Sequence, residues 1–314
     1  MGMLFTITLY ASEEGVARAA ARSAFQRVED LEQVLSDYRA DSELNLLREA
    51  TPGVPVVVSD TLFSVLSQAQ TLARKTGGAF DVTSGPMVRL WRFSRKRGTL
   101  PTQVDFDRAK AAVGWEKLKL DSRQQSVTLL TNHMQLDVGG IAKGFAADAA
   151  LGVLKAHGLP RALVAASGDI AIGSAPPGKP GWTVAVSGIE SKEGGGPFLL
   201  TLKDAAVSTS GDAEQYVNIN GVRYSHIVNP ATGMGLTNRI QATVIAPRAV
   251  LSDALATTVC VVGGNSGFKI VESFTGAHAL VIAPAGNERR ISTSPRFPGA
   301  ARLHKNFTGA GSSR

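Results

Sequence analysis

The order of apolar and polar residues predicts a strand followed by a long helix at the start of the chain. Apolar residues alternate with threonines over residues 4–10, which is the pattern of a half-buried strand. Ser12 then precedes two glutamates, and apolar residues at helical spacing continue to residue 35. We therefore expect a helix with Ser12 as its N-cap. Similar spacing predicts further helices over 61–76, 105–113, 141–157, 250–262 and 266–274.

Short apolar segments separated by turn residues predict many strands. The segments with this pattern are 116–120, 126–130, 134–138, 162–166, 182–187, 198–202, 205–208, 215–218, 222–224, 241–245 and 279–282. Strands outnumber helices, and short turns join many of them. The pattern therefore predicts an α+β fold with largely antiparallel sheets and packed helices.

Composition agrees with a folded chain and excludes several classes of protein. Of the 314 residues, 44% are hydrophobic and 19% are charged, which excludes a disordered chain. The sequence contains no run of 18 consecutive apolar residues, so it predicts no membrane-spanning helix. The single cysteine, Cys260, excludes an internal disulfide and a zinc site with several cysteines.

Positive charge is concentrated at the C-terminal end. The net charge is +7, and six Lys or Arg residues without any acidic residue follow position 288. The rest of the chain is close to neutral, so we expect no nucleic-acid-binding face. We predict one domain over residues 1–284 and a basic, loosely ordered tail over 285–314. An acidic partner or an anionic membrane surface is the alternative interpretation of the tail.

One segment has the pattern of a phosphate site. A predicted strand ends at Asp137, Gly139 and Gly140 follow, and a predicted helix then begins with Lys143 in its first turn. The N-terminus of a helix attracts anions, and a lysine there adds positive charge. The alternative is an ordinary strand-to-helix turn with a surface lysine.

Three further patterns carry candidate chemistry. Asp253 and Thr257 are four residues apart on a predicted helix, so their oxygens suit a hard cation such as Mg²⁺; otherwise they are a helix-terminal charge and a core hydroxyl. His226 lies beside a turn and is a candidate general base, although a lone histidine is more often structural. Residues 76–91 have the pattern of a pocket rim or of a plain connection.

Taken in order, these segments resemble the ApbE family of FAD:protein FMN transferases. The matching segments are Met1-Gly2, 35–44, 77–86, 136–148, 209–212, 226–233 and 253–257. The resemblance covers about residues 1–284. It implies a T-fold-like domain that binds FAD and Mg²⁺, transfers FMN from FAD to a threonine or serine hydroxyl of an acceptor protein, and releases AMP. Acceptors of this family resemble membrane redox subunits that carry a short threonine- or serine-containing motif.

The resemblance also implies roles for individual residues. It implies contacts to FAD, its substrate, from Met1, Tyr38, Ala79, Asp81, Asp137, Lys143 and Ile227. It implies Mg²⁺ ligands at the backbone carbonyl of Gly140 and at the side chains of Asp253 and Thr257. His226 matches the histidine proposed as general base. The attacking hydroxyl would belong to the acceptor protein, which agrees with the lack of a Gly-x-Ser-x-Gly motif in this chain.

The chain departs from the family pattern at two places. Ser167 stands where the family usually has glycine, a change we expect to matter little. Family members usually carry a signal peptide before the Met-Gly pair, whereas Met1 is that methionine here. We therefore expect a trimmed, periplasmic or inner-membrane-associated protein, with a cytoplasmic member as the alternative. The alternatives for function are an Mg²⁺-dependent FAD pyrophosphatase and a non-catalytic flavin-binding protein.

Overall fold

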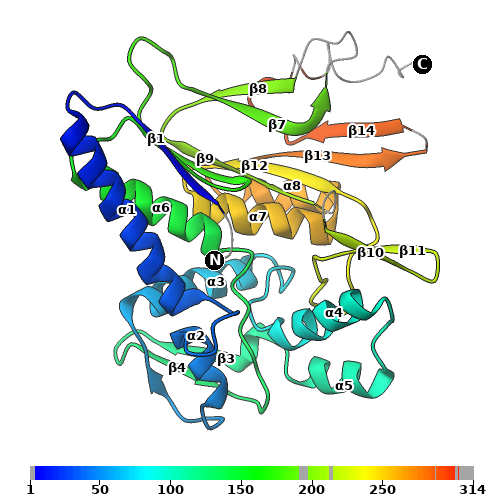
Figure 1. Cartoon of the computed structure of the whole chain (residues 1–314). Helices are drawn as coiled ribbons and strands as arrows, with labels where there is room; N and C mark the ends of the chain where they lie inside the picture. The colour runs from blue at the N-terminus through cyan, green and yellow to red at the C-terminus, as the bar shows by residue number, and fades with distance from the viewer. Residues whose placement is uncertain (1–3, 191–196, 212–214, 287, 301–302, 304–314) are drawn as a thin grey trace.

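A seven-stranded antiparallel sheet forms the centre of the molecule (Figure 1). The computed structural model describes residues 4–190, 197–211, 215–286, 288–300 and 303. In spatial order the strands are β1 (Phe5–Leu9), β5 (Ala162–Ala166), β6 (Asp169–Ile172), β9 (Ala205–Ser210), β12 (Gln241–Ala246), β13 (His278–Ala285) and β14 (Glu288–Thr293). The predicted α+β class is confirmed.

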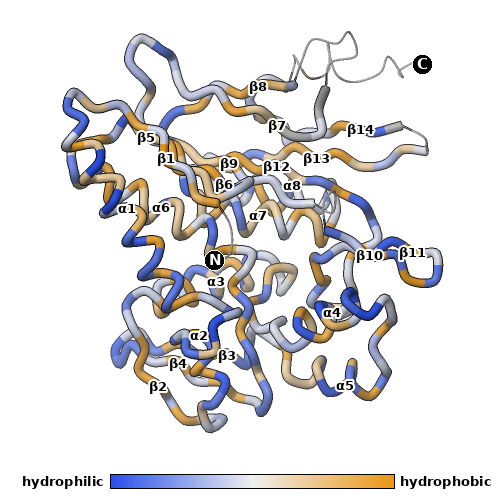
Figure 2. The backbone as a smooth tube through the Cα atoms, viewed as in Figure 1, coloured by the Kyte–Doolittle hydropathy of each residue, from blue (hydrophilic) through white to orange (hydrophobic). Residues whose placement is uncertain are grey.

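Helices cover one face of this sheet, and a β-hairpin covers the other. The covering helices are α1 (Glu14–Leu35), α6 (Ala142–Ala156), α7 (Ala249–Val262) and α8 (Gly264–Glu272). The hairpin consists of β7 (Trp182–Glu190) and β8 (Pro197–Leu202). Alternate residues of β8, beginning with Phe198, are buried against the sheet, as expected for a strand with one exposed face. Figure 2 shows apolar backbone segments gathered between these layers.

The remaining elements pack below α6 and α7 in the view of Figure 1. They are α2 (Glu43–Leu46), β2 (Val56–Val57), α3 (Asp60–Lys75), α4 (Gly85–Arg97), α5 (Gln103–Ala111), β3 (Leu118–Asp121), β4 (Ser126–Leu129), β10 (Tyr216–Ile219), β11 (Val222–Ser225) and the 3₁₀ turns Leu47–Glu49 and Trp115–Lys117. Trp91 of α4 fixes the β10–β11 hairpin, because its indole N–H donates to the Ser225 carbonyl at 2.9 Å and its ring meets Tyr224 edge-on.

Two local predictions differ from the structure. The helix over 12–35 begins at Glu14, and its N-cap is Glu13 without a side-chain cap bond, so the prediction of Ser12 as N-cap is wrong. Residues 134–138, which were expected to form a strand, do not form one. They make only an isolated β-bridge, between Gln135 and Ser84. Their backbone instead follows the loop before α4, where the Asp137 N–H donates to the Val82 carbonyl at 2.8 Å.

The C-terminal segment is more ordered than predicted. Strand β14 pairs with β13 over its whole length, and Phe297 and Leu303 are buried in the core under the β7–β8 hairpin. The prediction of a loosely ordered tail is therefore wrong for 285–286 and 288–300; residues 301–302 and 304–314 lie outside the described residues. Arg289 and Arg290 are exposed on the edge strand, so positive charge there is compatible with a folded strand.

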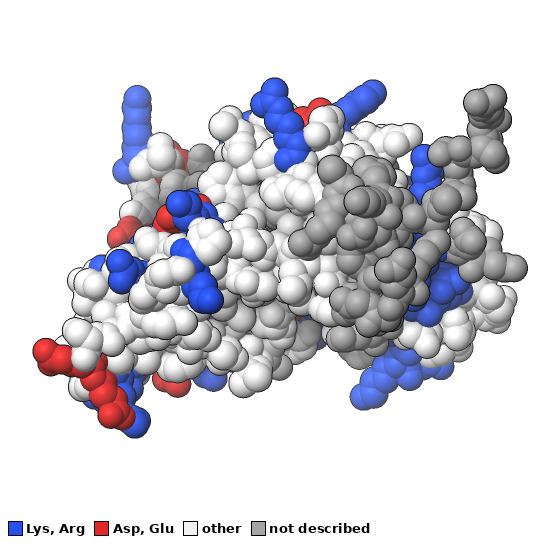
Figure 3. All heavy atoms as spheres, turned by 90° about the horizontal axis from the view of Figure 1, so that it is seen from above, with Lys and Arg blue, Asp and Glu red and all other residues white. Residues whose placement is uncertain are grey.

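The surface above the hairpin carries scattered charge. Figure 3 shows Lys and Arg side chains on this face standing singly or in small groups between uncharged surface. In the described part of the chain, no helix combines the length and apolar character that crossing a membrane requires.

Candidate functional site

A pocket of about 670 Å³ lies where the helices on the sheet meet the lower part of the molecule. Every predicted site residue that the structure describes lines it: Tyr38, Ala79, Asp81, Asp137, Gly140, Lys143, His226, Ile227, Asp253 and Thr257. Met1, the remaining predicted contact, lies outside the described residues. Segments from five places in the sequence thus meet at one cavity. The roles of the individual residues stay predictions.

Lys143 occupies the inner end of the pocket between two carboxylates. Its Nζ donates to Oδ2 of Asp169 and, at 3.2 Å, to Oδ1 of Asp253. The other oxygen of Asp253 accepts the backbone N–H of Gly144 at 3.0 Å. Asp253 is fully buried and Asp169 nearly so. Two carboxylates therefore share one ammonium, and when both acids are ionised one negative charge is in excess at this end of the pocket.

The close approach of α6 and α7 creates this cluster. A Cβ on Gly144 would lie 2.1 Å from the carbonyl oxygen of Ala249, so only glycine lets the helices come this close. Asp148 of α6 then accepts the backbone N–H groups of Ala249 and Val250 at 2.9 and 3.0 Å. Because these groups begin α7, the carboxylate caps that helix from its neighbour.

The pKa values of both Asp253 and Lys143 are raised above their ordinary values. Burial raises the pKa of Asp253, and Asp169 adds to the increase, while Lys143 and the Gly144 N–H oppose it. Burial alone would lower the pKa of Lys143, but Asp253 and Asp169 outweigh it and raise that pKa above its ordinary value. Lys143 therefore stays charged, and the two acids compete for its charge.

The oxygens around Thr257 fit a hard cation. A Cβ on Gly140 would lie 3.3 Å from Thr257 Oγ1, and Ser210 Oγ lies 3.3 Å from the same hydroxyl. Oδ1 of Asp169 is buried and has no hydrogen-bond partner among the described residues. Carboxylate, hydroxyl and carbonyl oxygens suit Mg²⁺. Since no group of three or more His, Cys, Asp or Glu residues is placed to hold a metal in the described part of the chain, water or phosphate would have to complete its shell.

The start of α6 differs from a typical phosphate site. The N–H groups of Ile141 and Ala142 both donate to the Val138 carbonyl, at 3.0 and 2.8 Å. Those of Gly139 and Gly144 donate to carboxylates. The expectation that helix N–H groups orient phosphate is therefore not met for these four, because the protein already uses them.

Arg92 of α4 forms a second cluster at the outer end of the pocket. Its guanidinium donates to Asp37 Oδ2 at 2.5 Å and to Asp137 Oδ2 at 3.0 Å. It also lies 4.9 Å from the centre of the Tyr38 ring. Burial and the nearby Asp37 raise the pKa of Asp137, while Arg92 and the Gly139 N–H oppose the increase. One arginine thus joins the loop after α1 to the turn before α6.

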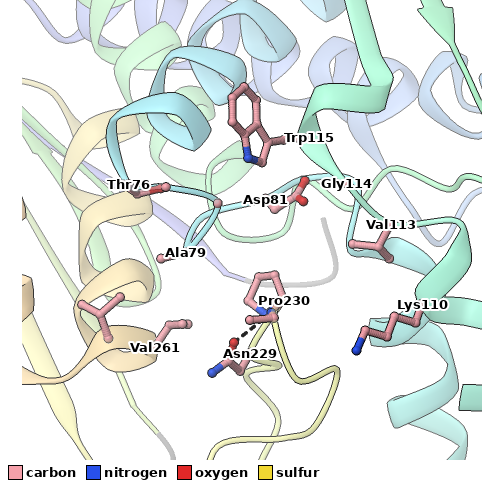
Figure 4. Close-up of a pocket in the computed structure, with 14 residues that line it drawn as sticks. Thr76, Ala79, Asp81, Lys110, Val113, Gly114, Trp115, Asn229, Pro230 and Val261 are labelled. Atoms are coloured by element: carbon pink, nitrogen blue, oxygen red, sulfur yellow. Dashed lines mark hydrogen bonds between the residues drawn. The ribbon is translucent and has the colours of Figure 1, made fainter. Parts of the chain in front are cut away.

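Asp81 lies between this pocket and a second one of about 560 Å³ (Figure 4). Its Oδ1 accepts the backbone N–H and the hydroxyl of Thr83, each at 2.7 Å, and burial raises its pKa. Figure 4 shows Asp81 and Trp115 facing the second pocket from one side, with Pro230 across from them.

His226 and Ile227 follow β11 at the side of the pocket. Nδ1 of His226 lies 3.2 Å from the Gln215 carbonyl oxygen, which also accepts the backbone N–H of His226 at 3.0 Å. A carbonyl only accepts, so this contact places the ring proton on Nδ1 and leaves Nε2 as the basic nitrogen. That tautomer suits a general base.

Sequence reasoning gave no role to two residues of these clusters. Asp169 follows the turn at Ser167 and Gly168, and its position opposite Ser208 in the sheet brings it to the face that α7 covers. Arg92 follows Trp91 in a segment predicted as a pocket rim, without a helix. The five basic residues at helical positions after Pro86 are the signal that could have indicated it.

Comparison with solved structures identifies the fold. A flavin transferase ApbE from Vibrio cholerae superposes with a TM-score of 0.84 and 28% identity, covering 94% of both chains. An ApbE protein from Thermotoga maritima gives a TM-score of 0.81 and 29% identity, also covering 94% of both. The fold is that of the solved flavin transferases.

Sequence comparison gives the family. The ApbE family model matches residues 1–281. The FAD:protein FMN transferase of Treponema pallidum is 33% identical over 94% of this chain and 84% of its own, and that of Vibrio cholerae is 30% identical over 87% and 82%. The chain belongs to the ApbE family, as its ordered motifs predicted.

Proposed function

We propose that this protein is an Mg²⁺-dependent FAD:protein FMN transferase that modifies a threonine or serine hydroxyl of an acceptor protein and releases AMP. Its family, and the name that its relatives carry, support the transferase activity. The observation that carries the metal requirement is the excess negative charge around Lys143. A pyrophosphate is itself negative, so it would be repelled from this end of the pocket unless a further cation entered with it.

The residues that would hold Mg²⁺ are Asp253, Thr257 and the carbonyl of Gly140. Bound there, the ion would offset charge on the pyrophosphate oxygens. Lys143 would supply a second positive charge nearby. The two clusters also divide the pocket, because the Arg92 end offers an aromatic ring and hydrogen-bonding groups that suit a flavin.

In the proposed reaction, the hydroxyl oxygen of the acceptor attacks the phosphorus of the FMN half of FAD. The bond from that phosphorus to the bridging oxygen breaks, and AMP leaves with the bridging oxygen. Nε2 of His226 accepts the hydroxyl proton, and the Gln215 carbonyl fixes the tautomer that makes this transfer feasible. The nucleophile comes from the acceptor, so the enzyme itself needs no reactive serine or cysteine.

The test is an incubation of the purified protein with FAD, Mg²⁺ and an acceptor carrying a threonine motif. The acceptor's intact mass should increase by one FMN, AMP should appear in equal amount, and chelation of Mg²⁺ should abolish both. Asp253→Ala should lose at least about 100-fold in rate, and His226→Gln about 100-fold. Asp107→Ala, which removes an exposed carboxylate from α5, serves as the matched control and should retain full rate.

Two outcomes would favour the alternative functions. Release of FMN and AMP at the same rate without acceptor would identify an FAD pyrophosphatase, in which water replaces the hydroxyl. Tight binding of FAD without either product would leave a flavin-binding protein, and the role of His226 would be withdrawn.

Acceptors of this type are expected at membranes, so we also propose a periplasmic or inner-membrane-associated location. The exposed Arg289 and Arg290 of β14 support weak attraction to an anionic surface. Replacing both by glutamine should reduce binding to phosphatidylserine vesicles at low salt. Unchanged binding would remove this part of the proposal.

A further inference from the structure

Both oxygens of the carboxylate that the metal needs already accept a hydrogen bond. Oδ1 of Asp253 accepts Lys143 at 3.2 Å, and Oδ2 accepts the Gly144 N–H at 3.0 Å. A backbone N–H cannot move away without disturbing α6. The lysine, in contrast, lies at the end of a flexible four-carbon chain.

We infer that Lys143 is an internal counter-ion that competes with Mg²⁺ for Asp253, and that Asp169 is the positioning residue that holds the ammonium when Asp253 is given up. This inference rests on the proposed function, because it takes Mg²⁺ as the ion at this site. It adds a role for Asp169 and a reason for the position of Lys143.

The surroundings of Asp169 suit this role. Asp169 begins β6, and pairing with Ala166 on one side and Ser208 on the other fixes its backbone. Its Oδ2 already accepts Lys143. Its Oδ1 is buried without a hydrogen-bond partner among the described residues. The carboxylate can therefore accept a second N–H of the same ammonium while its backbone stays in place.

Electrostatics favour an exchange over joint occupancy. Two cations on one buried carboxylate oxygen repel each other strongly, because little water screens them. Asp169 offers the ammonium a buried acceptor, so Lys143 keeps one ionic partner when it leaves Asp253. Without Asp169, Asp253 would be the only carboxylate left to the lysine in this cluster, and the competition with the metal would increase.

The experiment measures Mg²⁺ affinity by calorimetry in the full chain without FAD. Lys143→Met should bind Mg²⁺ about tenfold more tightly, since the competitor is gone. Asp169→Asn should bind it about tenfold more weakly. Adding Lys143→Met to Asp169→Asn should restore at least the original affinity. That rescue is not expected if Asp169 merely supports the fold.

A control variant separates the contact from general charge. Lys155→Met removes an exposed positive charge from α6 and should change the affinity less than twofold. A Lys155→Met effect as large as that of Lys143→Met would overturn the inference, as would unchanged or weaker binding by Lys143→Met. If Lys143→Met does not fold, the double variant Lys143→Met/Asp169→Asn is used instead, because it loses one charge of each sign. Its Mg²⁺ affinity is then compared with that of Asp169→Asn, and tighter binding by the double variant supports the inference.

A crystal structure with Mg²⁺ gives a second, independent readout. The Lys143 ammonium should lie within hydrogen-bond distance of Asp169 and no longer of Asp253, and persistence of the Asp253 contact would overturn the exchange. If the unaltered protein binds no Mg²⁺, the metal requirement of the proposed function fails. If it binds Mg²⁺ and the variants behave alike, only this inference fails.

Discussion

Two of the cations that line the pocket, Arg92 and Lys143, are each shared by two carboxylates. Arg92 joins Asp37 and Asp137 at the rim, with its own side chain 38% exposed. Lys143 joins Asp169 and Asp253 at the inner end, where the acids are 4% and 0% exposed. The rim cluster connects two loops, whereas the inner cluster connects two helices to the sheet.

Because the two clusters differ in burial, we expect them to contribute differently to folding stability and to ligand binding. Exposed ion pairs are screened by water and contribute about 0–1 kcal/mol to folding. Breaking a buried pair leaves a charge without compensation and costs about 3–5 kcal/mol. The acids of the rim cluster are 17% and 13% exposed, so we expect breaking the rim cluster to cost less stability than breaking the inner cluster. Under the proposed function, the inner cluster would couple folding to metal binding, because Asp253 would serve both.

The largest effect is expected from breaking the inner cluster. Asp253→Ala should lower the free energy of unfolding by about 3 kcal/mol, because the Gly144 N–H loses its partner and a buried cavity remains. Urea unfolding without Mg²⁺ measures this change. Asp107→Ala should lie within about 0.5 kcal/mol of the original chain. Equal stability of the two variants would contradict the importance assigned to the buried contacts.

The next effect comes from separating the helices that carry the inner cluster. Gly144→Ala should destabilise the protein by about 2 kcal/mol, because its Cβ would lie 2.1 Å from the Ala249 carbonyl oxygen and the helices would have to move apart. Gly152 lies in the same helix with open space around its Cβ. Gly152→Ala should therefore stabilise by about 0.5–1 kcal/mol. Thermal unfolding of both variants checks the opposite signs.

A smaller stability effect is expected at the rim. Arg92→Met should change the free energy of unfolding by less than about 1 kcal/mol but weaken FAD binding about tenfold, because Tyr38 and Asp137 lose the group that holds them together. Arg89→Met, on the exposed side of α4, is the control for loss of charge. Fluorescence quenching of FAD measures the affinity. Equal FAD affinity of the two variants would show that the rim cluster plays no part in binding.

The sequence predicted the inner site better than the rim. Asp253 and Thr257 are local partners on one helix, so their spacing alone places them together. Arg92 depends on α4, which was not predicted from the sequence, because residues 76–91, with Pro86 among them, have the pattern of a pocket rim or a connection. The proline instead lies in the first turn of α4, where its missing N–H costs nothing.

Long-range contacts explain the remaining errors. Residues 134–138 have an apolar pattern typical of a strand, but their backbone meets the loop before α4 instead of a neighbouring strand. The basic residues of β14 suggested a loose tail, although Ile291 packs on the core beneath the β7–β8 hairpin. In both cases the outcome depended on which partner the segment meets, and local pattern carries no information about that.

The smallest predicted effect concerns the turn that places Asp169. Ser167 has φ of 55°, a left-handed conformation that costs a residue with a Cβ about 1 kcal/mol. Serine at this position, where the family usually has glycine, therefore costs some stability. Ser167→Gly should stabilise the protein by about 0.5 kcal/mol, after the greater entropy of the unfolded glycine is included. Ser64→Gly, in the middle of α3, should destabilise by a similar amount. Denaturant midpoints would measure both changes, and a loss of Mg²⁺ affinity in Ser167→Gly would show instead that the strained turn helps to position Asp169.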